Sequence, residues 1–309
     1  MSVPRISEQM TKADAILAAV FEPRSINLKP FLLSLKKSGY KGEIIFFVTW
    51  ASPQEIRELE GLGIRVERFR YFYYRKNNPF TVLWPIWQLM FRNLPTLHAK
   101  KRIAQYVFNM MCVRFVVYHD YLSTNVDRHA NVLLTDARDV FFQDDPFRDF
   151  RETVVGFCLE DTRSTLWSNI TCRKMIEETY GGNVARELGD FPIACAGTTL
   201  GPAAAILEYL NLMLEHLFSA KWMHRVCVQD QGVHNYLAHV TMRDRRVLFE
   251  NGRGPVYTMG LCSEENFRFD DQGALLNVDG SVAPVLHQYD RFPQITNRLL
   301  KSLDQADPN

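Results

Sequence analysis

Asn131-Val-Leu-Leu-Thr-Asp136-Ala-Arg-Asp139-Val-Phe-Phe142 is the stretch that decides the predicted fold. Its aliphatic run ends at a threonine, and two carboxylates follow within four residues before apolar residues resume. Short apolar runs between turn signals are typical of interior strands in a parallel sheet. Ligands of open α/β sheets bind at the carboxyl ends of such strands. The stretch therefore predicts a buried strand with two acidic side chains at a ligand-binding edge.

Apolar runs and helical patterns alternate along the rest of the chain. Further strands are predicted at residues 15–21, 43–49, 64–69, 153–158, 247–249 and 283–287. Helices are predicted at residues 28–38, 53–62, 100–122, 203–219 and 230–239, with another helix start at 144–146. Strands separated by helices of about ten residues imply right-handed βαβ crossovers. We therefore predict an α/β fold, with a mostly parallel central sheet flanked by helices in a single domain over residues 13–300, between a flexible segment at 1–12 and a tail at 301–309.

The composition is that of an ordinary globular protein, with 47% hydrophobic and 23% charged residues. The formal net charge of +1 supplies no field that would attract nucleic acid. The six cysteines include no CxxC pair, which indicates reduced thiols and argues against a zinc site. Residues 1–12 lack the apolar core of a signal peptide, and no stretch reaches the roughly 18 apolar residues of a spanning helix. We expect a cytoplasmic protein that does not cross a membrane by itself.

Asp136 and Asp139 are the first candidates for a metal site, because two carboxylates form a hard-oxygen site for a divalent cation that can hold a diphosphate. The alternative is a pair of solvated turn carboxylates, one of them paired with Arg138. Residues three apart in an extended strand face opposite sides, so convergence requires a turn directly after Thr135. His287 follows the late apolar run, either as a hydrogen-bonded structural residue or as a third ligand. An imidazole beside two carboxylates suits Mn²⁺ better than Mg²⁺.

Two further segments carry polar or small residues at predicted element ends. Asp230-Gln231 begins a helix, where Asp230 serves either as an N-cap or as a contact for sugar hydroxyls and developing charge. His234, one helical turn later, is a weaker candidate metal ligand. Cys195-Ala-Gly197-Thr-Thr-Leu-Gly201 has two glycines that permit close backbone approach, or it forms a tight strand-to-helix turn. It does not match a P-loop.

In this order, the pieces resemble the GT-A class of nucleotide-sugar glycosyltransferases over roughly residues 13–295. The run from Leu133 to Phe147 resembles the strand, acidic motif and D-P-F sequence of that class. Gly197-Thr-Thr-Leu-Gly201 resembles its small-residue substrate loop, and Asp230-Gln231 resembles its D-Q helix start. His287 resembles the C-terminal metal histidine of glycogenin-type members. The motif departs from D-x-D in being D-x-x-D, so Asp139 is favoured as the metal ligand and Asp136 leans toward the ribose or the donor sugar.

The resemblance implies a Rossmann-like GT-A fold and a metal-dependent transfer of a hexosyl or similar group. The donor is a nucleotide-diphosphate sugar, the cofactor is Mn²⁺ or Mg²⁺, and the acceptor is a glycan, a lipid-linked molecule or a protein. The implied metal ligands are Asp139, His287 and Asp136. The implied donor-binding residues are Phe21, Arg102, Asp136, Arg138, Gly197, Thr198 and Gly201. Asp230 and Gln231 are the implied catalytic residues, with Glu160 as another candidate base if the reaction inverts configuration.

Two other functions stay open at this point. One is a non-catalytic GT-A-like protein that binds carbohydrate or a partner. The other is a metal-dependent phosphohydrolase, which is disfavoured because such enzymes carry an early D-x-D-x-[TV] motif. The aromatic tract at 71–91 either packs over the sheet or docks peripherally on the inner face of a membrane, aided by nearby Lys100, Lys101 and Arg102.

Overall fold

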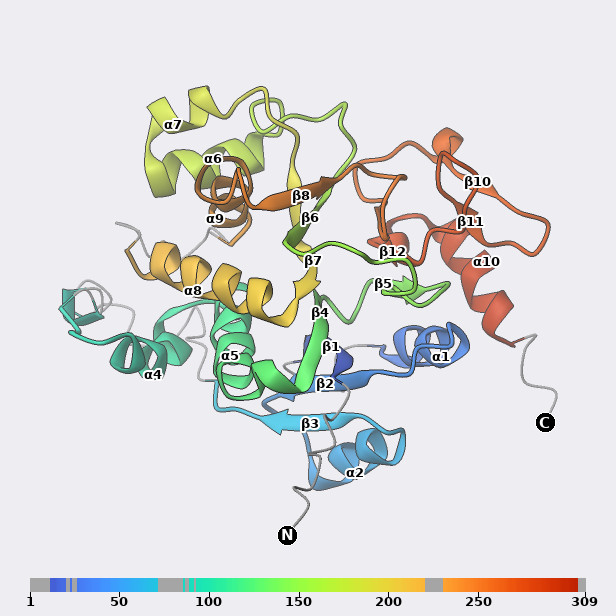
Figure 1. Cartoon of the computed structure of the whole chain (residues 1–309), viewed down its shortest axis with the longest axis horizontal. Helices are drawn as coiled ribbons and strands as arrows, with labels where there is room; N and C mark the ends of the chain where they lie inside the picture. Colours follow the sequence, from blue (N-terminus) through green and yellow to red (C-terminus); the bar gives the residue numbers. More distant parts are fainter. Residues whose placement is uncertain are drawn as a thin grey trace, which may run out of the picture.

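A seven-stranded sheet forms the centre of the computed structural model, which describes residues 12–20, 23, 27–71, 86, 89–91, 93–219 and 230–304 (Figure 1). The strands are β1 (Ala13–Val20), β2 (Glu43–Val48), β3 (Arg65–Arg68), β4 (His129–Thr135), β6 (Val155–Leu159), β7 (Ala194–Pro202) and β8 (Arg246–Phe249), in the order β3-β2-β1-β4-β7-β6-β8. Every pair in this sheet is parallel except those that involve β7, which runs against both of its neighbours. The predicted mostly parallel sheet flanked by helices is confirmed.

The central strands are buried on both faces, which explains their continuous apolar runs. Ala15 and Leu17 of β1 pack into a core with α5 (Met110–Asn125) and α8 (Ala203–Ser219). Ile16 and Ala18 point the other way, into a core with α1 (Lys29–Lys37). Figure 1 shows α5 and α8 on one side of the sheet and α1 on the other. Alternate residues of one strand thus serve two helical layers.

A second, three-stranded sheet stands beside the first. It contains β5 (Val140–Phe142), β12 (Val285–His287) and β9 (Val256–Thr258), with β12 in the middle, antiparallel to β5 and parallel to β9. Phe142 packs edge-on against Phe31 of α1 at 5.0 Å between ring centroids. The hairpin of β10 (Arg268–Phe269) and β11 (Leu275–Leu276) and helix α10 (Pro293–Asp304) complete this side. The small sheet therefore brings the late part of the chain beside the residues that follow β4.

The remaining described helices lie around the sheet. They are α2 (Pro53–Gly61), α4 (Leu97–Val107), α6 (Ile170–Tyr180), α7 (Gly182–Glu187) and α9 (Asp230–Tyr236). Helix α2 begins with a capping box, in which Ser52 accepts a hydrogen bond from the Glu55 amide and the Glu55 carboxylate accepts one from the Ser52 amide. Helix α10 runs to Asp304, so the first residues of the predicted tail at 301–309 are helical.

Three local predictions were wrong. Residues 100–122 do not form one helix, because Phe108 is extended and the Asn109 side chain caps α5 by accepting a hydrogen bond from the Cys112 amide at 3.0 Å. Residues 144–146 do not start a helix, since Asp145 closes a local turn by accepting from the Phe147 amide at 2.9 Å. Residues 195–201 do not form the tight strand-to-helix turn that was one of their two interpretations, since they lie within strand β7 and α8 follows directly.

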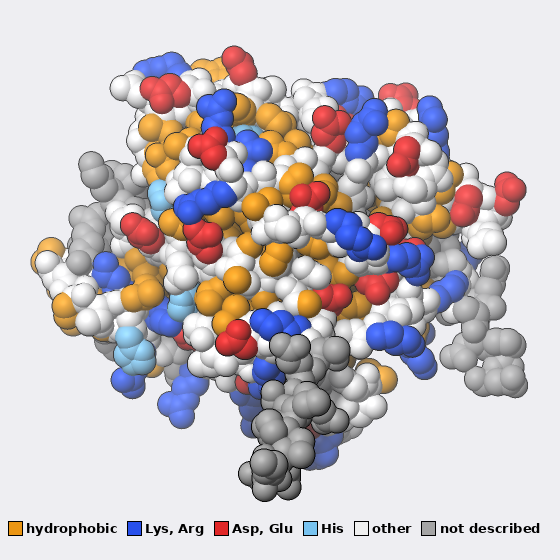
Figure 2. Space-filling view, viewed as in Figure 1, with side chains coloured by type: hydrophobic (Ala, Val, Ile, Leu, Met, Phe, Trp, Pro, Cys, Tyr) orange, Lys and Arg blue, Asp and Glu red, His pale blue; other side chains and the backbone are white. Residues whose placement is uncertain are grey.

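None of the described helices is long and apolar enough to cross a lipid bilayer. The aromatic tract at 71–91 lies mostly outside the described residues. On the face seen in Figure 2, acidic and basic side chains are interspersed and do not gather by sign. This distribution agrees with the formal net charge of +1.

Candidate metal centre

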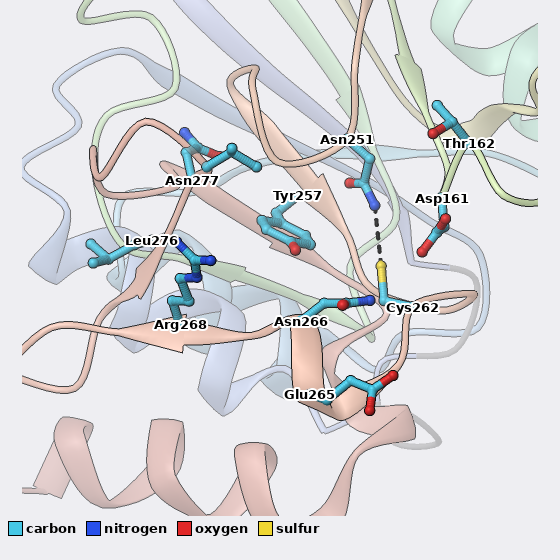
Figure 3. A pocket seen from close by; sticks show the side chains of 11 residues that line it. Asp161, Thr162, Asn251, Tyr257, Cys262, Glu265, Asn266, Arg268, Leu276 and Asn277 are labelled. Atoms are coloured by element: carbon cyan, nitrogen blue, oxygen red, sulfur yellow. Dashed lines mark hydrogen bonds between the residues drawn. The ribbon is translucent and has the colours of Figure 1, made fainter.

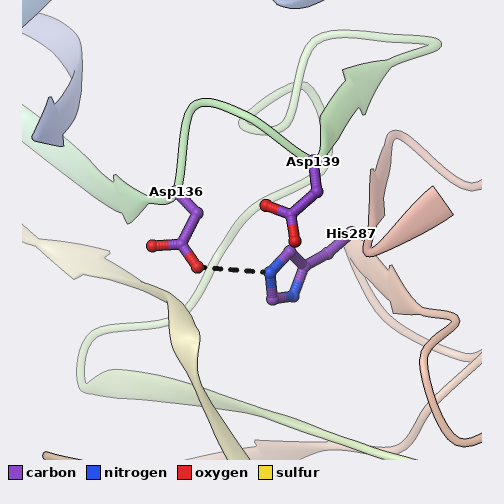
Figure 4. Close-up of side chains that lie close together, drawn as sticks. All are labelled: Asp136, Asp139 and His287. Carbon is purple, nitrogen blue, oxygen red and sulfur yellow. Dashed lines mark ion pairs between the residues drawn. The ribbon is translucent and has the colours of Figure 1, made fainter. Parts of the chain in front are cut away.

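Three side chains from separate elements converge at the carboxyl end of β4. Asp136 directly follows β4, Asp139 directly precedes β5, and His287 ends β12. One ligand atom from each residue lies within 4.8 Å of the other two (Figure 4). Within the described part of the chain, this is the one group of three or more His, Cys, Asp or Glu side chains with such spacing. The sequence prediction that these residues meet therefore agrees with the structure.

Backbone hydrogen bonds hold the two carboxylates on the same side. The Asp136 amide donates to the Gly197 carbonyl at 2.9 Å, so the chain leaves β4 anchored to β7. It then bends into β5, which supplies the turn after Thr135 that convergence requires. The Gln288 amide donates to the Asp139 carbonyl at 2.7 Å. This bond fixes Asp139 beside the end of β12.

His287 is buried, and its two ring nitrogens face different neighbours. Nδ1 lies 3.6 Å from the Cys195 sulfur, and Nε2 lies 3.5 Å from Oδ2 of Asp136. Nε2 makes no hydrogen bond within the described residues, although it is fully enclosed. Burial by itself would lower the pKa of His287, but the Asp136 and Asp139 carboxylates outweigh it and raise the pKa. In its neutral form, an enclosed ring nitrogen beside a carboxylate could ligate a metal ion.

Arg114 sets the orientation of Asp136. One Arg114 nitrogen, Nη1, pairs with Oδ1 of Asp136, which leaves Oδ2 directed toward His287. Burial by itself would raise the pKa of Asp136, but the Arg114 guanidinium and His287 outweigh it and hold the pKa below its usual range. Asp136 is therefore ionised at neutral pH, with Oδ2 facing His287.

The same arginine binds a third carboxylate. Its Nη2 donates to Oδ2 of Asp230 at 2.7 Å and to the Ala196 carbonyl at 3.0 Å. Arg114 and Asp230 are both buried. Burial raises the pKa of Asp230, and Arg114 opposes that shift. The sequence prediction missed Arg114, and the available signal was a single cation inside the apolar stretch 107–118.

Asp139 has a different environment from Asp136. Burial raises its pKa, and His287 opposes that rise while Asp136 adds to it. Arg138 is exposed and lies 3.3 Å from the Asp139 carboxylate and 3.4 Å from that of Asp290. Arg138 thus stands at the exposed edge of the centre, Asp139 is buried, and Asp136 is partly exposed.

The surrounding residues fit a divalent cation. Two carboxylates and an imidazole form the mixed oxygen and nitrogen set that suits Mn²⁺. A Cβ atom on Gly197 would lie 2.4 Å from Cε1 of His287 and 2.7 Å from Oδ2 of Asp136, so glycine keeps this space open. Arg114 pairs with Asp136 and Asp230, and Arg138 pairs with Asp139, so three carboxylates face two guanidinium groups.

Other predicted site residues lie in and around β7. Gln231 is held by the β7 backbone, since its Oε1 accepts from the Ala196 amide at 2.9 Å and its Nε2 donates to the Ala194 carbonyl at 2.8 Å. Thr198 is buried opposite Thr135, next to the centre. Gly201 pairs with Val132, further back along β4, so the structure does not bring it to the cluster.

Two described residues among the predicted ones, Arg102 and His234, do not join the centre. Arg102 is an exposed residue of α4. Phe21 lies outside the described residues. His234 is buried elsewhere, with Nδ1 2.8 Å from the Tyr209 hydroxyl, so it is not part of the metal cluster.

Glu160 is a further buried carboxyl at the same edge of the sheet. It directly follows β6, and its amide donates to the Ile193 carbonyl at 2.8 Å. Burial raises the pKa of Glu160, and the positive charge of His287 opposes that rise. A carboxyl with a raised pKa near a metal centre is suited to exchange a proton.

The chain was also compared with known proteins. No protein-family model matches it, and no curated protein matches its sequence.

Proposed function

We propose that this protein is a metal-dependent glycosyltransferase that moves a sugar from a nucleotide-diphosphate sugar to an acceptor hydroxyl. The observation that carries the proposal is the convergence of Asp136, Asp139 and His287 at the carboxyl end of β4. Mn²⁺ is the favoured cation and Mg²⁺ the alternative, because an imidazole accompanies the carboxylates.

The strand order supports a nucleotide at this position. The chain passes from β1 outward to β2 and β3, and then returns to place β4 on the other side of β1. The ends of β1 and β4 thus form a topological switch point, where open α/β sheets bind nucleotides. Asp136 stands directly at the end of β4. A nucleotide there would have its phosphates beside the cluster.

The residues of the cluster have separable roles in this proposal. A divalent cation held by the cluster would supply positive charge that stabilises the departing nucleotide diphosphate. Asp139 and His287 would hold the cation, and Asp136 would contribute Oδ2. Arg114 keeps Asp136 ionised and turned toward the centre. Arg138, exposed at the edge, presents a guanidinium that suits a phosphate.

Two carboxyl groups are candidates for the base that an inverting transfer requires. Asp230 is already bound to Arg114, which stabilises its ionised form and reduces its tendency to accept a proton. Glu160 has a pKa raised by burial and has no such ion pair within the described residues. We therefore favour Glu160 for an inverting reaction. Gln231 is engaged by the backbone of β7, so we assign it a supporting role.

The cysteines favour a cytoplasmic location for this activity. Cys158, Cys172 and Cys195 are buried free thiols, and Cys262 is a partly buried one. Unpaired thiols persist in reducing compartments. The proposed acceptor is a glycan, a lipid-linked molecule or a protein, and docking through 71–91 on the inner membrane face would favour the lipid-linked class.

The test is release of nucleotide from a panel of nucleotide sugars by the purified protein with Mn²⁺. We expect release with at least one donor, and loss of more than about 100-fold for Asp139→Ala, because a direct ligand contributes at least as much as its supporting partners. The control is Asp149→Ala, which removes an exposed carboxylate in the turn after β5. It should match the wild type, and both variants should unfold cooperatively.

Three results would contradict the proposal. Phosphate release from sugar phosphates without nucleotide release would identify a phosphohydrolase. Mn²⁺-dependent thermal stabilisation by UDP or GDP, with no release from any donor, would identify a non-catalytic binding protein. If calorimetry detects no Mn²⁺ binding, even with UDP or GDP present, the proposed metal site does not exist.

A further inference from the structure

A polar cavity of about 300 Å³ lies between the loop after β6, strand β9 and the β10–β11 hairpin (Figure 3). Tyr257 stands at its centre, with Asp161 and Glu265 on one side and Arg268 and Leu276 on the other. None of these side chains belongs to the metal cluster. The cavity is therefore a separate candidate site.

The cavity is adjacent to the metal centre but separated from it by the small sheet. Thr258 pairs with His287, and Tyr257 pairs with Leu286. Because successive residues of a strand point to opposite faces, Tyr257 faces away from the His287 side. After β6, the charge of His287 influences the pKa of Glu160, whereas the next residue, Asp161, lines the cavity. Two sites thus share the same strand ends.

The floor of the cavity is formed by packed and hydrogen-bonded side chains and offers a hydrogen-bond donor. The Tyr257 ring packs edge-on against Phe267 at 5.9 Å between centroids. Burial raises the pKa of Tyr257 to about 12, so its hydroxyl keeps its proton at neutral pH. That hydroxyl makes no hydrogen bond to any described residue. Asn251 is fixed beside it by bonds to the amide and carbonyl of Thr258, both at 2.8 Å.

The rim carries opposite charges in balance. Asp161 pairs with Arg163 at 2.6 Å, and this partner lowers the pKa of Asp161. Glu265 and Arg268 form no ion pair with any described residue, so both are available to a ligand. A phosphate or carboxylate ligand would meet the unpaired carboxylate of Glu265 beside Arg268, while Arg163 already pairs with Asp161. A neutral ligand with many hydroxyls would instead find acceptors in the carboxylates and donors in Arg268 and Tyr257.

We propose that this cavity binds a neutral saccharide. Ligand pockets of about this volume combine a few fixed polar groups with an apolar surface, which Leu276 and Val278 supply here. Saccharide binding stands on the cavity alone. Its assignment as an anchor for a glycan acceptor rests on the proposed transferase function.

The test is saturation-transfer difference NMR with metal-free protein in EDTA. The probes are the methyl α-glycosides of glucose, galactose and mannose, N-acetylglucosamine, maltose and lactose. Glucuronic acid and glucose 6-phosphate serve as charged counterparts. We expect at least one neutral probe to bind, and to bind more tightly than either charged sugar. Tyr257→Phe and Glu265→Gln should each weaken binding about fivefold to tenfold, the effect of one lost hydrogen bond.

Matched controls separate this site from its surroundings. Glu264→Gln changes the neighbouring exposed carboxylate, which does not line the cavity, and should bind like the wild type. Asp139→Ala should also retain saccharide binding while losing Mn²⁺ binding, so the two proposals fail independently. Thermal unfolding of each variant should match the wild type.

The proposal is overturned if none of the neutral probes binds, or if Tyr257→Phe and Glu265→Gln bind the saccharide as tightly as Glu264→Gln does. It is also overturned if these two variants weaken binding of UDP or GDP in Mn²⁺ instead, because the cavity would then belong to the nucleotide.

Discussion

The Nε2 atom of His287 lies 3.5 Å from Oδ2 of Asp136, although the two residues come from distant parts of the chain. The contact joins the end of β12 in the small sheet to the end of β4 in the large one. The two side chains are closely packed against the backbone of Gly197 in β7, which leaves no space for a larger residue there. Three strands from two sheets therefore meet at one point, and changes at that point should have measurable effects.

Gly197→Ala should disrupt the centre directly. The new Cβ would lie 2.4 Å from His287 and 2.7 Å from Asp136, so one of the two side chains must move. Overpacking should lower the free energy of unfolding by about 1–3 kcal/mol. We also expect Mn²⁺ binding to be at least about tenfold weaker, because Asp136 or His287 is displaced. Urea unfolding and calorimetry measure these two quantities.

Gly61→Ala is the matched control, because a Cβ there has nothing within 4 Å. Gly61 is the last residue of α2, far from the candidate metal ligands in the sequence, so its substitution should leave Mn²⁺ binding unchanged. Alanine favours a helix more than glycine does, so the free energy of unfolding should rise by at most about 1 kcal/mol. Wild-type Mn²⁺ binding by Gly197→Ala would show that the ion does not lie between Asp136 and His287.

Arg114→Met should be strongly destabilising. It removes the cation that lies between the Asp136 and Asp230 carboxylates and leaves a buried charge unpaired. We expect a loss of about 3–5 kcal/mol in the free energy of unfolding, measured in urea. Arg57→Met, on the exposed face of α2, should change stability by no more than about 0.5 kcal/mol.

Adding Asp230→Asn to Arg114→Met should restore part of the lost stability, because it removes the charge that Arg114 had paired. Additive effects of the two substitutions would show that Asp230 does not depend on Arg114.

Gln231→Ala tests whether this residue acts in catalysis or in support. The substitution removes the hydrogen bond to the Ala196 amide, whereas the Ala194 carbonyl keeps its bond from Asn235. One unsatisfied amide in β7 should cost about 1–3 kcal/mol in urea unfolding. A loss of nucleotide release with unchanged stability would instead favour the catalytic role predicted from the sequence.

The free energy of unfolding should decrease as the pH is lowered, because His234 is buried in its neutral form. Burial lowers the pKa of His234 to about 3, whereas an unfolded histidine titrates near 6.5. Between these values the unfolded chain binds a proton that the folded chain excludes. The stabilisation is therefore complete above about pH 6.5 and is lost as pH falls toward the folded pKa. One such group contributes about 2 kcal/mol of lost stability between pH 6.5 and pH 5.

The measurement is urea unfolding across that pH range for the wild type, His234→Gln and His98→Gln. The pH slope should decrease in His234→Gln, which removes the titrating group. His98 is exposed on α4, and its substitution should leave the slope unchanged. Equal slopes for all three proteins would show that His234 is not buried in its neutral form.

The strands around the centre could be predicted because their signals are local. Residues 132–134 are apolar since β4 is buried on both faces, and Thr135 is polar where the strand ends. The break between α4 and α5 was missed, although Asn109 carries the N-cap signal, because the apolar pattern continues across it. The sequence did not separate strand β7 from a turn, because its small residues reflect close packing, including that of Gly197 against His287.

The sequence by itself determined the alternation of strands and helices, the acidic pair at the end of β4 and a histidine able to join it. The tertiary structure alone decided that Arg114 binds Asp136 and Asp230, which lie 22 and 116 residues further along the chain. It also decided that Gln231 supports β7. Periodic burial is encoded within a few neighbouring residues, whereas the partner of a buried charge depends on how distant elements pack.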